Sequence, residues 1–169
     1  TVRRSVCKGL QINRSIRKLS ISDNGIGDRG CAAVAKLLTT GSPLQHLNLS
    51  CNKIGPAGCH SLMLAVTSFH ARLEHLDIGC NPVGEEGRMA ICSLVGGAAS
   101  LAELDLCSLE LNDEHAKLLV AQLRQPRCGI CKLWYYNNEE ISTEREPELT
   151  AALEHNKEIR SSASPQRTI

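Results

Sequence analysis

Residues 44–55 read LQHLNLSCNKIG, and the spacing of the apolar residues in this stretch decides the fold. A helix buries residues three and four apart, whereas a half-buried strand alternates apolar and polar residues. Here the alternation holds only from Leu47 to Leu49, which predicts a very short strand. Asn52 then occupies a position where an inward-facing residue is expected. The stretch specifies neither a helix nor an ordinary strand.

The same pattern recurs along the chain. Equivalent stretches read IRKLSISDNGIG, LEHLDIGCNPVG, LAELDLCSLEL and ICKLWYYNNEEI. The five units start at positions 16, 44, 73, 101 and 130, so their spacing is nearly constant. A fixed period of roughly 20–29 residues with the pattern L-x-x-L-x-L-x-x-N-x-L is the signature of a leucine-rich repeat. Residues 1–15 read as a partial repeat that precedes the first full unit.

The second half of each unit is predicted to be helical, because its apolar residues fall three and four apart. Neighbouring parallel strands lie about 4.8 Å apart, whereas packed helices need about 8–10 Å. Units with strands on one side and helices on the other must therefore curve. The sequence predicts an α/β fold, a right-handed βα horseshoe segment with a parallel sheet on the concave face and helices on the convex face.

In four of the units an asparagine follows the short strand, where the chain turns toward the helix: Asn24, Asn52, Asn81 and Asn138. Backbone groups at this corner have no sheet partners, and an inward amide can both donate to them and accept from them. We expect these side chains to stack as a ladder of hydrogen bonds. The fourth unit has Leu109 at this position, which predicts a locally altered turn.

The long repeat, the IGxxG turn (IGDRG, IGPAG and, with Val, VGEEG) and the helical outer half resemble the ribonuclease-inhibitor-like subfamily of leucine-rich repeat proteins. The resemblance covers about residues 5–155. Members of that class include inhibitors, a GTPase-activating protein for Ran, actin regulators, innate immune sensors and ciliary components. The resemblance implies a scaffold that binds other proteins, and it implies no cofactor.

The repeats are predicted to form one elongated domain over residues 1–157, because solenoid units contact only their neighbours. The sequence begins inside a repeat without a polar cap, so we expect a partner or further repeats at the N-terminal edge. At the other end, Pro147 is predicted to start a short helix. Residues 158–169 are polar and are predicted to be a disordered tail.

Composition argues against several function classes. The formal net charge of +1 gives no electrostatic reason to bind nucleic acid or an anionic membrane. No apolar run approaches the roughly 20 residues of a membrane span, and the basic N-terminus lacks the apolar stretch of a signal peptide. We expect a cytoplasmic protein, possibly cytoskeletal or ciliary, that is not an enzyme.

Two groups of residues have types and spacings that also occur in metal or redox sites, but a simpler interpretation is available for each. Cys128 and Cys131 have C-x-x-C spacing, but they lie in a loop and the next strand with no second pair. His46 and His75 occupy the same outward position in neighbouring strands. Two histidines and a carboxylate can ligate a metal, yet a polar binding surface is the simpler interpretation. No metal site is predicted.

The outward strand residues form the predicted binding surface for a protein partner. They are His46, Asn48, His75, Asp77, Glu103, Asp105, Trp134 and Tyr136. Trp134 and Tyr136 are aromatic residues of the kind enriched in interface hot spots, although the C-terminal segment could instead cover them. The predicted function is a protein–protein interaction scaffold in a larger assembly. The alternative is a GTPase-activating module of the Ran type, with Arg14, Arg17 and Lys18 as candidate groups.

Overall fold

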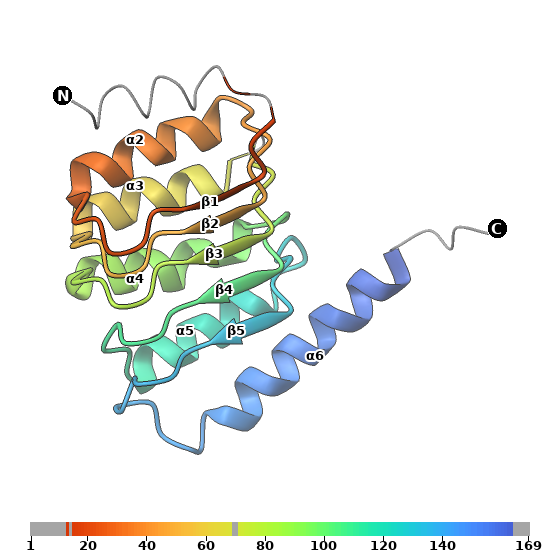
Figure 1. Ribbon diagram of the computed structural model, residues 1–169. Helices are drawn as coiled ribbons and strands as arrows, with labels where there is room; N and C mark the ends of the chain where they lie inside the picture. Colours follow the sequence, from red (N-terminus) through yellow and green to blue (C-terminus); the bar gives the residue numbers. More distant parts are fainter. Residues whose placement is uncertain (1–12, 14, 69–70, 164–169) are drawn as a thin grey trace.

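The structure is a computed structural model that describes residues 13, 15–68 and 71–163 (Figure 1). Its five three-residue strands are β1 (Lys18–Ser20), β2 (His46–Asn48), β3 (His75–Asp77), β4 (Glu103–Asp105) and β5 (Lys132–Trp134). They pair in parallel and in chain order to form one sheet (Figure 1). Each repeat therefore supplies one strand, and the outward residues of successive strands lie in register.

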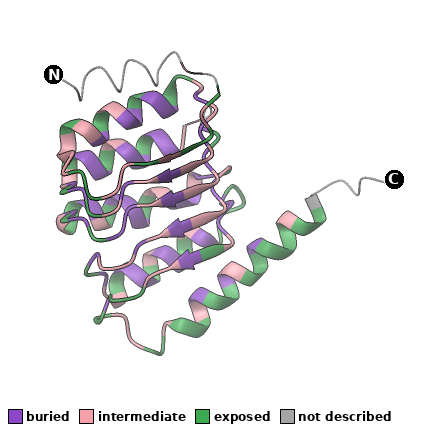
Figure 2. Ribbon diagram, viewed as in Figure 1, coloured by how far each residue is buried: buried purple, intermediate pink, exposed green. Residues whose placement is uncertain are grey.

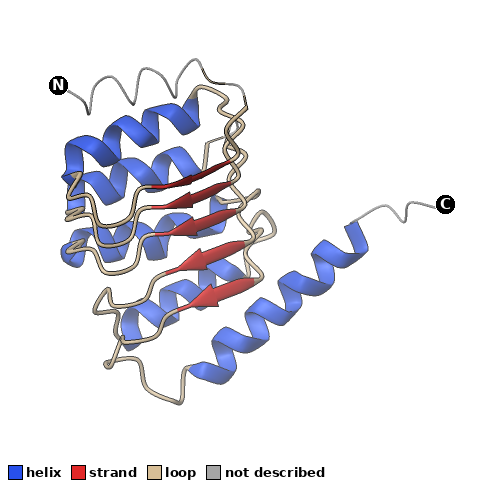
Figure 3. Cartoon of the chain, in the orientation of Figure 1, coloured by secondary structure: helices blue, strands red, loops and turns tan. Residues whose placement is uncertain are grey.

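The helices form a second layer on one side of the sheet (Figure 3). They are α2 (Gly27–Thr39), α3 (Pro56–Val66), α4 (Gly84–Leu94), the short 3-10 helix η1 (Val95–Gly97) and α5 (Asp113–Leu123). The inward leucines of β2, β3 and β4, namely Leu47, Leu76 and Leu104, pack in the core beneath these helices and are almost fully buried, whereas Leu19 on the edge strand β1 is partly buried (Figure 2). The predicted α/β leucine-rich repeat solenoid is confirmed.

The repeated asparagines tie each turn to the turn before it. Asn52 is fully buried; its Nδ2 donates to Leu49 O at 3.0 Å and to Ile21 O at 2.8 Å, in the preceding repeat. Its Oδ1 accepts the N–H of Asn24 at 3.0 Å. The amide of Asn81 links to the second repeat in the same way. Asn138 makes the equivalent contacts to the turn of the fourth repeat. Asn24, by contrast, is exposed and bonds within its own turn.

The turn at Leu109 is not altered as predicted. Ser108 (φ 56°) and Glu110 (φ 59°) have the left-handed conformation that Cys51 (φ 56°) and Lys53 (φ 57°) have in the second repeat. The Oδ1 of Asn138 accepts both backbone N–H groups of this turn, so its conformation does not depend on its own side chain. An asparagine at position 109 would have bonded the turn of the third repeat, as Asn81 and Asn138 bond the turns that precede them. Its absence therefore affects the third repeat. Pro82 follows Asn81 there, and Val83 N–H bonds to Asn81 O at 2.8 Å.

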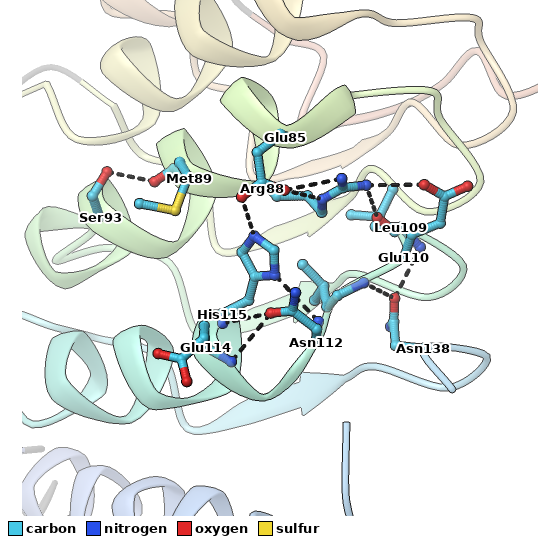
Figure 4. A network of polar contacts seen from close by, with 11 residues as sticks. Glu85, Arg88, Met89, Ser93, Leu109, Glu110, Asn112, Glu114, His115 and Asn138 are labelled. Atoms are coloured by element: carbon cyan, nitrogen blue, oxygen red, sulfur yellow. Dashed lines mark hydrogen bonds and ion pairs between the residues drawn. The ribbon is translucent and has the colours of Figure 1, made fainter. Parts of the chain in front are cut away.

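A polar network joins the third and fourth repeats at the same place (Figure 4). The Asn112 side chain caps α5 by accepting the N–H of His115 at 3.1 Å, while His115 Nδ1 accepts the Asn112 N–H at 3.2 Å. The other ring nitrogen of this buried histidine lies 3.3 Å from Glu85 on α4. Arg88 pairs with both Glu85 and Glu110, at 3.0 Å each. These contacts hold α5 against α4.

The C-terminal helix is longer than predicted. Helix α6 spans Glu146–Ala163, so residues 158–163, which were expected to be disordered, are helical, and residues 164–169 lie outside the described part. Two polar anchors explain the extension. The buried Asn156 donates to Leu123 O at 2.9 Å and to Ile130 O at 2.7 Å. One turn later, Arg160 donates to Gly129 O at 2.9 Å. Helix α6 thus packs on α5 and runs diagonally across the end of the repeat stack (Figure 1).

Candidate interaction surface

The outward strand residues line a groove of about 490 Å³ on the face of the sheet opposite the helices. We call it the concave groove. Seven of the eight predicted partner-binding residues line it: His46, Asn48, His75, Asp77, Glu103, Asp105 and Trp134. The eighth, Tyr136, lies beyond the end of β5 and lines a neighbouring hollow next to α6. The register of the short strands brings these residues together from four separate repeats.

Two carboxylates face each other in the middle of the groove. Asp77 and Asp105 are register partners on β3 and β4. A methyl group placed on Gly79 would lie 3.4 Å from the Oδ1 atom of each, so both carboxylate oxygens lie close to this residue. Burial raises the pKa of Asp77, and the Asp105 charge raises it further. The free protein therefore holds like charges close together at a cost.

These side chains also have a structural role that the sequence reasoning missed. Asn48, Asp77 and Asp105 each accept the backbone N–H two residues further on: from Ser50 at 3.0 Å, from Gly79 at 3.0 Å and from Cys107 at 2.9 Å, respectively. Such short-range bonds close an Asx turn as the chain leaves the strand. The recurrence of Asn, Asp and Asp at the same repeat position was the available signal.

Histidines and charged groups gather at the N-terminal ends of the strands. The rings of His46 and His75 are stacked, with centroids 4.1 Å apart and planes 20° from parallel. His75 Nδ1 lies 3.0 Å from Glu103 Oε2, and Lys132 Nζ lies 3.7 Å from the same oxygen. Partial burial lowers the pKa of His46, and His75 beside it lowers it further. Glu74, which sequence reasoning missed because it precedes the strand, lies beside this pair.

Aromatic residues lie at the edge of the surface formed by the last repeat, on and just after β5. The Lys132 ammonium sits 4.6 Å from the ring centroid of the partly buried Trp134, a cation–π arrangement. Tyr136 is 70% exposed. The described part of the C-terminal segment, up to Ala163, therefore does not cover Tyr136; α6 packs against α5 instead.

The remaining candidates from the sequence have structural roles. Cys128 and Cys131 donate through their thiols to the backbone oxygens of Val95 and Ala102. Burial raises the pKa of Cys31, Cys59 and Cys92 to about 12, which keeps these thiols protonated and unreactive.

Of the suggested basic groups, Arg14 lies outside the described residues. Lys18 is the first residue of β1 and lines the concave groove, and Arg17 immediately precedes it. Among the described residues, none of the helices has the length and hydrophobicity of a membrane span.

A family model described as "Leucine Rich repeat" matches residues 13–35, 42–63 and 72–92. The chain is also similar to the ribonuclease inhibitor of Mus musculus, with 32% identity over 132 residues. It is a leucine-rich repeat protein of the ribonuclease-inhibitor-like type. The match covers 78% of this leucine-rich repeat chain and 29% of the inhibitor, so the chain spans less than a third of that relative's length.

Two solved structures share the fold. The actin-binding site 2 of leiomodin-1 superposes with a TM-score of 0.82 at 11% identity, covering 96% of this chain and 93% of that one. The C-terminal domain of tropomodulin from Caenorhabditis elegans superposes with a TM-score of 0.75 at 12% identity, covering 96% of this chain and 97% of that one. At these identities the likeness concerns the fold.

Proposed function

We propose that this leucine-rich repeat protein is an interaction scaffold whose concave groove binds a protein partner through a basic side chain. The observation that carries the proposal is the Asp77–Asp105 pair. Asn48 makes the same Asx turn with a neutral side chain, so the turn does not require charge at the other two positions. Two like-charged carboxylates held close together beside Gly79 weaken the free fold, and a bound cation near both of them would reverse that cost.

The rest of the groove fits the same kind of partner. Trp134 offers a partly buried aromatic surface beside the acidic pair, and tryptophan is among the residues that most often anchor interfaces. Five strands spaced about 4.8 Å apart make a sheet roughly 20 Å across. That size favours a modest, transient interface over an obligate one.

The structural likenesses suggest where to look for the partner. The leiomodin-1 segment is named as an actin-binding site, and it shares this fold along nearly the whole chain. We therefore propose a cytoplasmic setting, cytoskeletal or ciliary, in which the groove holds a basic segment of an assembly component. The search should use the native extract, because the chain matches only part of the length of its curated relative.

Crosslinking mass spectrometry in native extract identifies the partner, and binding kinetics with purified components then test the groove. The double variant Asp77→Asn with Asp105→Asn keeps both turn acceptors and removes both charges. It should slow association and reduce the salt dependence of the association rate. Trp134→Ala should mainly speed dissociation, at a cost of about 2 kcal/mol or more. Glu86→Gln, which removes an exposed charge on α4, is the matched control. Unchanged affinity in both the double variant and Trp134→Ala would place the partner elsewhere.

A further inference from the structure

We propose that His46, His75 and Glu74 form a binding site for a divalent transition-metal ion of the Zn²⁺ class. His46 on β2 and His75 on β3 are register partners, and Glu74 immediately precedes β3. One ligand atom from each of the three side chains lies within 4.8 Å of the other two. All three residues are partly exposed, so an ion in solution has access to them.

Binding requires a small contraction of this cluster. Tetrahedral coordination with bonds of about 2.1 Å puts ligand atoms about 3.4 Å apart. The Cα positions of His46 and His75 are fixed by the strand register, but their side chains lie at the surface of the groove. Rotation about the side-chain torsions therefore brings the nitrogens together without moving the strands.

Neighbouring residues already orient two of the three ligands. Glu103 Oε2 lies 3.0 Å from His75 Nδ1. A carboxylate on one ring nitrogen is the usual support for a metal-bound histidine, because it holds the proton there and leaves the other nitrogen for the ion. On the other side, Gln45 Nε2 donates to Glu74 Oε1 at 2.9 Å, which leaves the second carboxylate oxygen available. The stacking of the two imidazole rings does not by itself require the contact of Glu103 with His75 or that of Gln45 with Glu74.

The ligand set selects the class of ion. Imidazole nitrogens suit Zn²⁺, Co²⁺, Ni²⁺ and Cu²⁺, whereas Ca²⁺ and Mg²⁺ prefer oxygen ligands. Three protein ligands leave a fourth position open. His46 and His75 line the concave groove, so that position faces the groove.

The test measures metal binding directly, by calorimetric titration with ZnCl₂ and by absorption of the Co²⁺ complex. Thiolates also bind these ions, so the parent protein carries Cys51→Ser and Cys80→Ser at the two described exposed cysteines and Cys7→Ser outside the described residues. In this background the test variants are His46→Asn, His75→Asn and Glu103→Gln. His60→Asn, at an exposed histidine on α3, is the matched control.

We expect the parent to bind one Zn²⁺ per chain and to give a Co²⁺ spectrum without thiolate bands. Each histidine variant should bind at least about 10-fold more weakly, and Glu103→Gln about 10-fold or more, the usual loss when the residue supporting a ligand is changed. His60→Asn should bind like the parent. The proposal is overturned if the parent does not bind Zn²⁺, if both histidine variants bind with parental affinity, or if thiolate bands dominate the Co²⁺ spectrum. Melting temperatures of the metal-free variants identify any that fail to fold.

Discussion

Replacing Asp77 by asparagine should stabilise the free protein. Asparagine keeps the side-chain oxygen that accepts the Gly79 N–H at 3.0 Å, so the Asx turn persists. It removes the charge that faces Asp105 across the sheet. The substitution thus separates the electrostatic role of the residue from its structural role. Asp77→Ala, which removes both the charge and the acceptor, is the matched comparison.

The size of the effect follows from the geometry. The two Oδ1 atoms each lie 3.4 Å from the same point beside Gly79, so their separation is at most twice that distance. For charges about 7 Å apart, Coulomb's law gives roughly 0.6 kcal/mol in a medium like water and about 2.4 kcal/mol at an effective dielectric constant near 20. Because both residues are partly exposed, we expect about 1 kcal/mol. For a chain of this size that raises the melting temperature by roughly 2–4 °C. Asp77→Ala should gain less or lose stability, because the Gly79 N–H loses its partner.

The pH dependence supplies an independent check. A carboxyl whose pKa is raised in the folded state binds its proton more tightly there than in the unfolded chain. Stability therefore falls as the pH rises from the ordinary carboxyl pKa through the raised one. The advantage of Asp77→Asn should be complete at pH 7 and should shrink as the pH falls through the raised pKa of Asp77, because that carboxyl then takes up its proton and loses its charge. Thermal unfolding of both variants at pH 3.5, 5 and 7 measures this. Equal melting temperatures for wild type and Asp77→Asn at pH 7 would refute the electrostatic argument.

Two further predictions concern the turns. Asn52→Ala should lower the free energy of unfolding by about 3 kcal/mol or more, because it leaves several buried backbone groups without partners. Asn24→Ala, at the exposed first position of the ladder, should cost less than about 1 kcal/mol, and equal losses in chemical denaturation would contradict the ladder. Cys51 and Cys80 are exposed, occupy the same position in neighbouring repeats and interact through their side chains. Mild oxidation with diamide should join them, and peptide mapping that recovers both as free thiols would exclude that disulfide.

The inward half of the structure could be predicted from the sequence because the repeat constrains it. Every strand must bury a leucine between the sheet and a helix, and the spacing of Leu47 and Leu49 recurs wherever that requirement holds. Register then follows without further information, since each strand pairs with the equivalent residues of the next repeat. That register places the equivalent outward residues of successive strands side by side, and these are the residues that line the concave groove.

Predictions failed where a residue acts on a repeat other than its own. Leu109 was expected to change its own turn, but the amide at this position serves the preceding repeat, so the departure appears at Pro82 and Val83. Likewise, the polar composition after residue 157 indicated disorder, yet Asn156 and Arg160 anchor α6 to carbonyls at Leu123, Ile130 and Gly129. Here the polar residues of the helix find backbone carbonyls at the end of the repeat stack to bond, so the segment is ordered as far as the structure describes it.

The outward residues at the first and third positions of the strands carry different charges, and this difference imposes a direction on any basic partner. At the N-terminal ends of the strands, Lys132 lies near Glu103 and so offsets its charge. Two residues further along the strands, Asp77 and Asp105 face each other, and the residue next to Asp105 on β5 is Trp134. A cationic side chain therefore meets its strongest attraction toward the C-terminal ends of β3 and β4, beside the aromatic ring. The proposed ion at His46 and His75 would add positive charge at the opposite ends, which sharpens the same gradient. One sheet would then present a cationic end and an anionic end, which fixes the orientation of an extended segment lying in the groove.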